Sequence, residues 1–155
     1  MKKLIVLGLM AIATAFATQT YAQETGDELN GVWESGNGKA KVKIDKISGK
    51  YYGRIVWLKE PIDPETEKPK VDKNNPDESM RNAPLKGYRM LKDFTYDAEA
   101  KEWTGGTIYD PESGSLYSCV IKMKDDNTLE IRGYIGVKTL GRTDVWKRLV
   151  IKKKK

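Results

Sequence analysis

The sequence predicts an all-β protein: an antiparallel, up-and-down β-barrel of about eight strands, with one long loop between the third and fourth strands. Three observations lead to this prediction. Apolar and polar residues alternate with a period of two in several runs, turn signals separate the runs, and helical periodicity is almost absent. Closing such a meander into a barrel removes its exposed edges, although a two-sheet sandwich is the alternative.

The strands follow from the runs between turn signals. We expect them at residues 31–35, 39–45, 50–59, 86–95, 102–109, 115–123, 128–135 and 142–150. The alternation is clear in 39–45, where apolar residues alternate with lysines, and Gly133 within 128–135 suggests a bulge or a sharp bend. An eight-stranded barrel is either filled by side chains or holds one small ligand. The function depends on which of these applies.

Residues 60–85 are far too long for a hairpin connection and carry five prolines and many charges. A short helical turn is expected here, with Asn75 as its N-cap and Pro76 at its first position. Such a loop could act as a lid over one end of the barrel, and Asp72, Asn75, Pro76 and Asp77 are the candidate lid residues. A plug or a loop that merely crosses the end is the alternative.

The N-terminus has the pattern of a secretory signal peptide. Lys2 and Lys3 precede an apolar run that is too short to span a membrane, and Thr20-Tyr21-Ala22 fits a cleavage site. We therefore expect a soluble protein that is periplasmic or secreted. The expected organisation is a signal peptide (1–22), a flexible mature N-terminus (23–29), a single β-barrel domain (30–150) and a basic tail (151–155).

The net charge of +6 comes from the two ends of the chain. Lys2, Lys3 and the four lysines of 152–155 account for it, and the remainder is balanced. A nucleic-acid-binding protein would carry clustered basic residues with interleaved aromatics, and this pattern is absent from the sequence. The lysine tail is either simply solvated or associates weakly with an anionic envelope surface.

The residue types argue against catalysis. The sequence contains no histidine, which excludes Ser-His-Asp triads, Cys-His pairs and histidine metal sites. Cys119, the single cysteine, is expected to be a small buried residue. Acids in 72–78 and at Asp110 and Glu112 leave carboxylate catalysis as an alternative, but turn chemistry and surface solvation explain them better. A calcium site is a further alternative for 72–78 alone, although its spacing does not fit an EF-hand. We expect no enzyme, no cofactor and no metal.

The first and last strands carry a paired signature. Gly31-Val32-Trp33 resembles the Gly-x-Trp of the lipocalin superfamily, in which the Trp plugs one end of the barrel and an Arg from the last strand packs across the indole. Here the last strand reads "GRTDVWKRL" and offers Arg142 and Arg148, on either side of Trp146. An arginine over an indole gains cation–π attraction and can also cap carbonyl groups.

Longer pieces strengthen the resemblance. "YYGRIVWLKEP", "DKNNPDE", "APLKGYRML" and "EWTGGTIYDPESGSLYS" are similar, in order and spacing, to the exported bacterial family called domain of unknown function 2147, over essentially all of residues 30–149. The resemblance implies a lipocalin-like β-barrel exported to the periplasm or beyond. It does not imply a particular ligand.

Candidate ligand-binding residues are polar or aromatic groups on otherwise apolar strand faces. These are Tyr52, Arg54, Trp57, Tyr88, Arg89, Tyr109 and Tyr117. Tyr52 and Arg54 are expected to share a face with Leu58, and a phenol and guanidinium lining would suit an amphipathic acid. We expect the barrel to bind a small hydrophobic or amphipathic molecule. The alternative is a cell-envelope interaction protein that acts through its exterior and its basic C-terminal tail.

Overall fold

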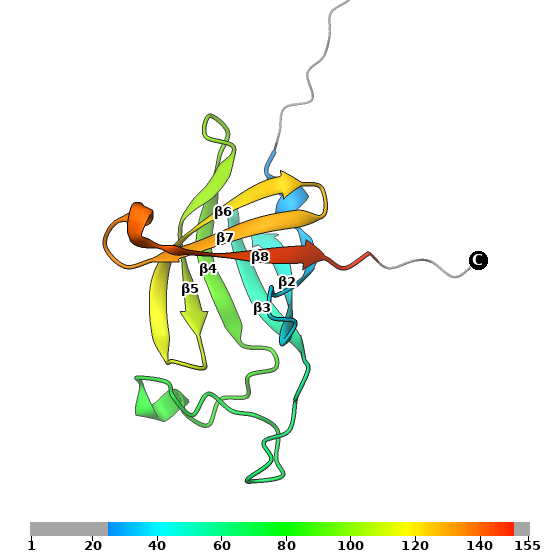
Figure 1. The fold of residues 1–155 in the computed structure, drawn as a ribbon, viewed down its shortest axis with the longest axis vertical. Coiled ribbons are helices and arrows are strands. Elements are labelled where there is room, and N and C mark those ends of the chain that lie inside the picture. The colour runs from blue at the N-terminus through cyan, green and yellow to red at the C-terminus, as the bar shows by residue number, and fades with distance from the viewer. Residues whose placement is uncertain (1–24, 151–155) are drawn as a thin grey trace, which may run out of the picture.

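The chain forms a closed antiparallel barrel, which confirms the predicted fold class (Figure 1). The computed structural model describes residues 25–150, so the expected signal peptide and the lysine tail lie outside the described residues. The strands are β1 (Gly31–Glu34), β2 (Ala40–Ile47), β3 (Lys50–Leu58), β4 (Arg89–Asp97), β5 (Glu102–Asp110), β6 (Ser115–Asp125), β7 (Thr128–Tyr134) and β8 (Arg142–Arg148). Each strand begins and ends within three residues of its predicted bounds.

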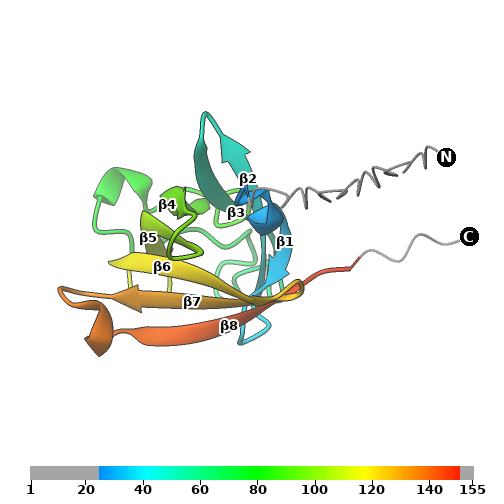
Figure 2. The ribbon, with the colours of Figure 1, turned by 90° about the horizontal axis from the view of Figure 1, so that it is seen from above.

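Every strand pairs with its neighbours in sequence, and β1 also pairs with β8 to close the barrel. Because the strand direction alternates, the connections 35–39, 59–88, 111–114 and 135–141 gather at one end, which we call the loop end. Figure 1 shows the long loop, in green, extending beneath this end of the barrel beside the turn between β5 and β6. Figure 2 shows the barrel from above, with residues 27–29, in blue, beside β1 and β2.

The opposite end, which we call the closed end, is filled by large apolar side chains. They include Trp33, Ile44, Tyr51, Leu91, Phe94, Trp103, Ile121 and Leu129, each at most 2% exposed. Two inward-facing glycines make room for them: a Cβ atom on Gly53 would lie 2.7 Å from Leu91, and one on Gly106 would lie 2.4 Å from the Phe94 ring. Each buried large side chain contributes about 1.5–3 kcal/mol, so this end is the stable part of the barrel.

The segment before β1 also belongs to the closed end. Residues 23–29 were expected to be flexible, but residues 25–29 pack on the barrel and include the 3₁₀ helix η1 (Asp27–Leu29). Leu29 is fully buried, and the Trp103 indole donates a hydrogen bond to the Gly26 carbonyl at 3.1 Å. The expectation is therefore wrong for residues 25–29, because a buried leucine and an indole donor hold them in place.

No helix between residues 25 and 150 is long and apolar enough to cross a membrane.

Candidate functional site

The loop end of the barrel is hollow. It contains a cavity that is open to solvent and has a volume of about 1090 Å³, slightly above the roughly 300–1,000 Å³ usual for ligand pockets. Seven strands supply its apolar wall: Ala40, Ile55, Leu58, Met90, Ile108, Tyr117, Ile131 and Trp146. The barrel is thus packed with side chains at one end and hollow at the other.

Gly133 on β7 helps to keep the cavity open. It lines the cavity, and a Cβ atom there would lie 3.4 Å from Ile108 and 3.5 Å from Tyr117, at ordinary contact distances. A Cβ atom on Gly53 or Gly106 would clash with a large side chain at the closed end, whereas one on Gly133 would make only ordinary contacts. A larger residue at this position would therefore project into the cavity.

The long loop folds back on itself across the loop end. Short stretches of its two arms pair, since the Asp72 amide donates to the Ala83 carbonyl at 2.9 Å and the Leu85 amide to the Lys70 carbonyl at 3.0 Å. Val71 and Leu85 contribute apolar side chains to the cavity lining. The loop is also fixed to the turn between β5 and β6, because the Asn74 side-chain amide donates to the carbonyl groups of Pro111 and Glu112.

A buried polar cluster anchors the loop to the barrel, and we call it the Asp72 latch. Its members are Asp72, Asn75, Tyr88 and Tyr109. The Asp72 carboxylate is fully buried and accepts hydrogen bonds from the Tyr109 hydroxyl at 2.8 Å and from the Asn75 amide at 2.7 Å. Tyr88 stacks at a tilt on Tyr109, with ring centroids 5.4 Å apart. Burial and the bond to Asp72 raise the pKa of Tyr109, so the phenol stays a donor.

The structure brings predicted lid residues and predicted ligand residues together in this latch. Asp72 and Asn75 hold the loop, while their neighbours Val71, Lys73 and Asn74 line the cavity. Asn75 is not a helix N-cap as expected. The 3₁₀ helix η2 (Glu78–Met80) begins later and is capped by Asp77, because Asn75 instead accepts a hydrogen bond from the Asp77 amide. Pro76 is exposed.

The acids considered for catalysis or calcium have local structural partners. Asp77 accepts hydrogen bonds from Ser79, and Asp110 from Glu112 and Ser113, as in ordinary turns. Within residues 25–150 there is no group of three or more acidic or cysteine side chains placed to hold a metal ion.

The predicted ligand residues divide into two sets. Tyr109 and Tyr117 line the cavity, and Tyr88 packs against Tyr109 and the hydrophobic core. Tyr52, Arg54, Trp57 and Arg89 are not among the lining residues. The Tyr52 ring contacts the Arg89 guanidinium at 4.8 Å, Lys41 lies 4.4 Å from the Trp57 ring, and Arg54 is exposed.

The expectation that Tyr52, Arg54 and Leu58 share a face is wrong because of a β-bulge. In the register of β2 with β3, Val42 pairs with Ile55 and Lys41 pairs with Trp57, so Val56 is an extra residue. Beyond the bulge the alternation is reversed. Leu58 therefore lines the cavity, while Tyr52 and Arg54 stay on the outer face.

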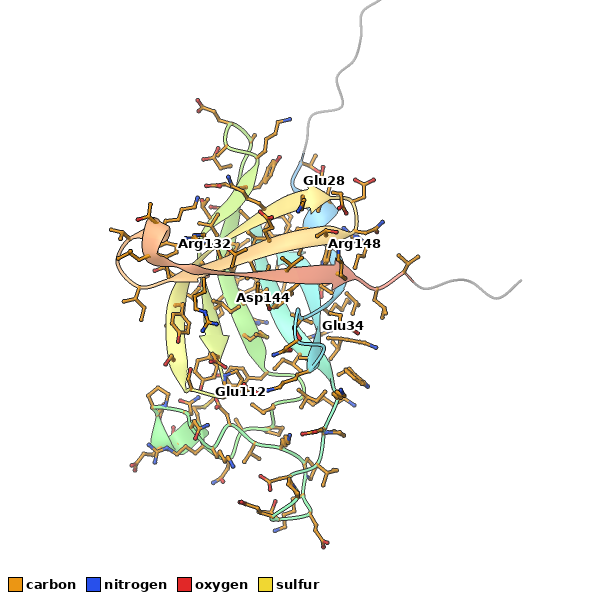
Figure 3. All side chains as sticks on the ribbon, viewed as in Figure 1. Glu28, Glu34, Glu112, Arg132, Asp144 and Arg148 are labelled. Carbon is orange, nitrogen blue, oxygen red and sulfur yellow. The ribbon has the colours of Figure 1, made fainter. Side chains whose placement is uncertain are left out.

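At the closed end, Arg148 is the arginine that packs on Trp33. Its guanidinium lies 4.0 Å from the Trp33 ring and donates to the carbonyl groups of Glu28, Asn30 and Asp126. Figure 3 shows Arg148 and Glu28 near each other at this end. Gly31 has a φ of 145°, and a Cβ atom there would lie 2.6 Å from the guanidinium. The Gly-x-Trp spacing thus provides both the plug and the space for the arginine.

Arg142 lies at the other end of β8, where it lines the cavity with Asp144 and Trp146. Figure 3 shows Asp144 on the side of β8 that is toward Glu112 and the loop end. Sequence reasoning considered Arg142 only as a partner for Trp33 and did not select Asp144 or Gly133. The period-two alternation along β8 could have identified Arg142 and Asp144, because it places them on the same strand face as the buried Trp146.

Comparison with known proteins agrees with this geometry. A family model described as "Uncharacterized protein conserved in bacteria (DUF2147)" matches residues 31–148. A solved structure described as "Protein HP1028 from the human pathogen Helicobacter pylori belongs to the lipocalin family" is similar, with a TM-score of 0.66 and 26% sequence identity. The match covers 79% of this chain and 83% of that one. No curated protein matches the sequence.

Proposed function

Because this chain belongs to the DUF2147 family of bacterial proteins and folds as a lipocalin-like barrel, we propose that it binds a small hydrophobic or amphipathic molecule inside the barrel. The observation that carries this proposal is the cavity of about 1090 Å³ with its apolar wall. A cavity of this size lined by isoleucine, leucine, methionine and tryptophan favours an apolar guest, since transfer of apolar surface from water is favourable.

Native mass spectrometry tests this function. The protein would be purified gently from its own host and compared before and after denaturation. We expect an additional mass that is lost on unfolding and that identifies the bound molecule. A bare polypeptide mass that persists after incubation with host lipid extract would contradict the proposal.

We further propose that the protein acts by binding rather than by catalysis. The sequence has no histidine, and the buried carboxylate near the cavity, Asp72, is engaged by Tyr109 and Asn75. Export is part of the same proposal, resting on the signal-peptide pattern of residues 1–22. Fractionation of the host cells, with N-terminal sequencing of the mature protein, would test both the compartment and cleavage before Gln23.

One observation favours the alternative of an envelope interaction protein. The connection between β7 and β8 exposes Ile135, Val137 and Leu140 by 73%, 55% and 80%, and clustered exposed apolar side chains mark interaction surfaces. Co-sedimentation with phosphatidylglycerol vesicles would test it, using the full chain, a Leu140→Ser variant and a chain lacking residues 151–155. Binding that both changes weaken would support this function. Equal sedimentation of all three would remove its support.

A further inference from the structure

The cavity has one cationic side chain on its strand wall, Arg142, and the position of that residue follows from the register of β8. Arg142 pairs with Gly133, Asp144 with Ile131, and Trp146 with Leu129. Ile131, Leu129 and Trp146 are buried in the core, so this set of pairs faces the interior of the barrel. The inward side of β8 therefore changes from indole to carboxylate to guanidinium as it approaches the loop end.

The Arg142 guanidinium is available for a ligand. Gly133, directly opposite, has no side chain that could cover or pair with it. Within residues 25–150, the guanidinium has neither a hydrogen-bond acceptor nor an ion-pair partner, and the residue is exposed. Arg148 on the same strand is different, because it donates to three carbonyl groups and stacks on Trp33. An arginine with no structural partner at a cavity entrance is suited to bind an anion.

The acids around the entrance already have donors. Asp144 accepts hydrogen bonds from the Trp146 indole at 2.7 Å and from the Gly36 amide at 3.3 Å, which hold its carboxylate on these two donors. Glu112 is paired with Lys39, with Nζ 2.6 Å from Oε1.

The same holds for Glu60, which pairs with Lys70 at 3.2 Å. By contrast, Lys59 and Lys73 line the cavity and form no ion pair with any residue from 25 to 150. Among the acids that line the cavity, Glu65 is the one whose carboxylate has neither a hydrogen-bond donor nor an ion-pair partner within residues 25–150. Arg142, Lys59 and Lys73 are therefore cations of the lining that no carboxylate within residues 25–150 neutralises by an ion pair.

We propose that Arg142 binds the oxyanion head group of a single-chain amphiphile whose apolar tail occupies the cavity. This inference rests on the proposed function and specifies its ligand class. A guanidinium presents paired N–H donors that match a carboxylate or phosphate group, and the wall beyond it, at Ile131 and Trp146, is apolar. The head lies at the loop end and the tail points toward the filled, closed end of the barrel.

Titration with matched probes tests the proposal. Hexadecanoate, monohexadecyl phosphate and hexadecanol share one tail and differ in the head, and their affinities would be measured by displacement of N-phenyl-1-naphthylamine. The proteins are the wild type, Arg142→Gln, and Arg54→Gln as a control that removes an exposed arginine from the outer face. Thermal melting of each variant would establish that it is folded.

We expect the wild type and Arg54→Gln to bind at least one of the two anions about tenfold or more tightly than hexadecanol, as a charged hydrogen bond implies. Arg142→Gln should lose this preference and keep its affinity for hexadecanol. The anion that binds more tightly identifies the head group as carboxylate or phosphate.

Three results would overturn the inference while leaving the proposed function standing. The wild type could bind all three probes with equal affinity, Arg142→Gln could bind the anions as tightly as the wild type does, or Arg142→Gln could lose affinity equally for all three probes. If the wild type binds none of them, both the inference and the proposed function fail.

Discussion

The Arg148 guanidinium lies over the Trp33 indole at 4.0 Å and joins the last strand of the barrel to the first. Trp33 is fully buried, and its own N–H donates to the Leu29 carbonyl at 2.9 Å. The two residues thus fasten η1, β1 and β8 at the closed end, opposite the cavity. Stability and ligand binding should therefore be separable by mutation at the two ends of β8.

Trp33→Ala should destabilise the protein by about 3–5 kcal/mol, since it removes a fully buried indole and leaves a void. Urea unfolding followed by circular dichroism would measure the free energy of unfolding. A loss below about half a kcal/mol, as is usual at surface sites, would contradict the role of Trp33 as the plug.

Arg148→Lys should cost roughly 1–3 kcal/mol, because the three carbonyl groups are bound by three different guanidinium nitrogens. The single nitrogen of a lysine cannot occupy all three positions, so some carbonyl groups are left without a partner. Arg142→Lys is the matched control on the same strand and should change stability by less than about 0.5 kcal/mol. Equal losses in the two variants would show that the contacts of Arg148 have no special weight.

The Asp72 latch should hold the long loop in place. Tyr109→Phe removes one of two hydrogen bonds to a buried carboxylate, which should cost roughly 1–3 kcal/mol and speed amide hydrogen exchange in residues 70–85. Tyr117→Phe is the control, since the Tyr117 hydroxyl has no hydrogen-bond partner in the range 25–150. Unchanged exchange in Tyr109→Phe would mean that the loop is held by its other contacts.

Glu102 should make stability depend on pH. Burial raises the pKa of this carboxyl, but bonds from Lys138 and Lys122 outweigh burial and bring it below its ordinary value of 4.5. The ion pairs therefore stabilise the fold above that value, and the contribution is lost as the pH falls through the lower, folded-state pKa.

The measurement is the free energy of unfolding of the wild type and Glu102→Gln across this range. At neutral pH the wild type should be more stable than Glu102→Gln. The difference should not exceed about 1 kcal/mol, because both lysines are partly exposed and solvent screens the ion pairs. The gap should close in acid. A gap that stays constant with pH would exclude an ionic origin.

Cys119 should be unreactive in the folded protein. Burial raises the pKa of its thiol to about 12, so the thiolate is scarce even at mildly alkaline pH. Ellman's reagent should label the thiol slowly under native conditions and rapidly in guanidinium chloride. Rapid labelling of the native protein would contradict the buried position on β6.

The strands were predictable from sequence because alternation and turn residues are local signals. The contact between an arginine of β8 and Trp33 was also predictable, although the choice between Arg142 and Arg148 was not. That choice depends on which end of β8 pairs with β1, and the register sets Trp33 opposite Arg148.

The candidate site was less predictable for a similar reason. The bulge at Val56 reverses the alternation of β3 and moves Leu58 to the inside, and no single residue in that stretch signals it. The Asp72 latch joins residues 37 positions apart, so local patterns could select Asp72 and Tyr109 separately but could not pair them.

We propose that the hollow end of the barrel holds the ligand, and a side chain that fills this end tests the proposal most directly. The leucine of Gly133→Leu would project into the cavity. The control is Glu130→Leu, which places a leucine on the same strand but on its outer face, at a position paired with Lys122 and Val145. We predict that N-phenyl-1-naphthylamine binds saturably to the wild type and to Glu130→Leu, and that Gly133→Leu stays folded but loses this binding. Equal binding by all three proteins would contradict the claim, because the ligand would then lie outside the barrel.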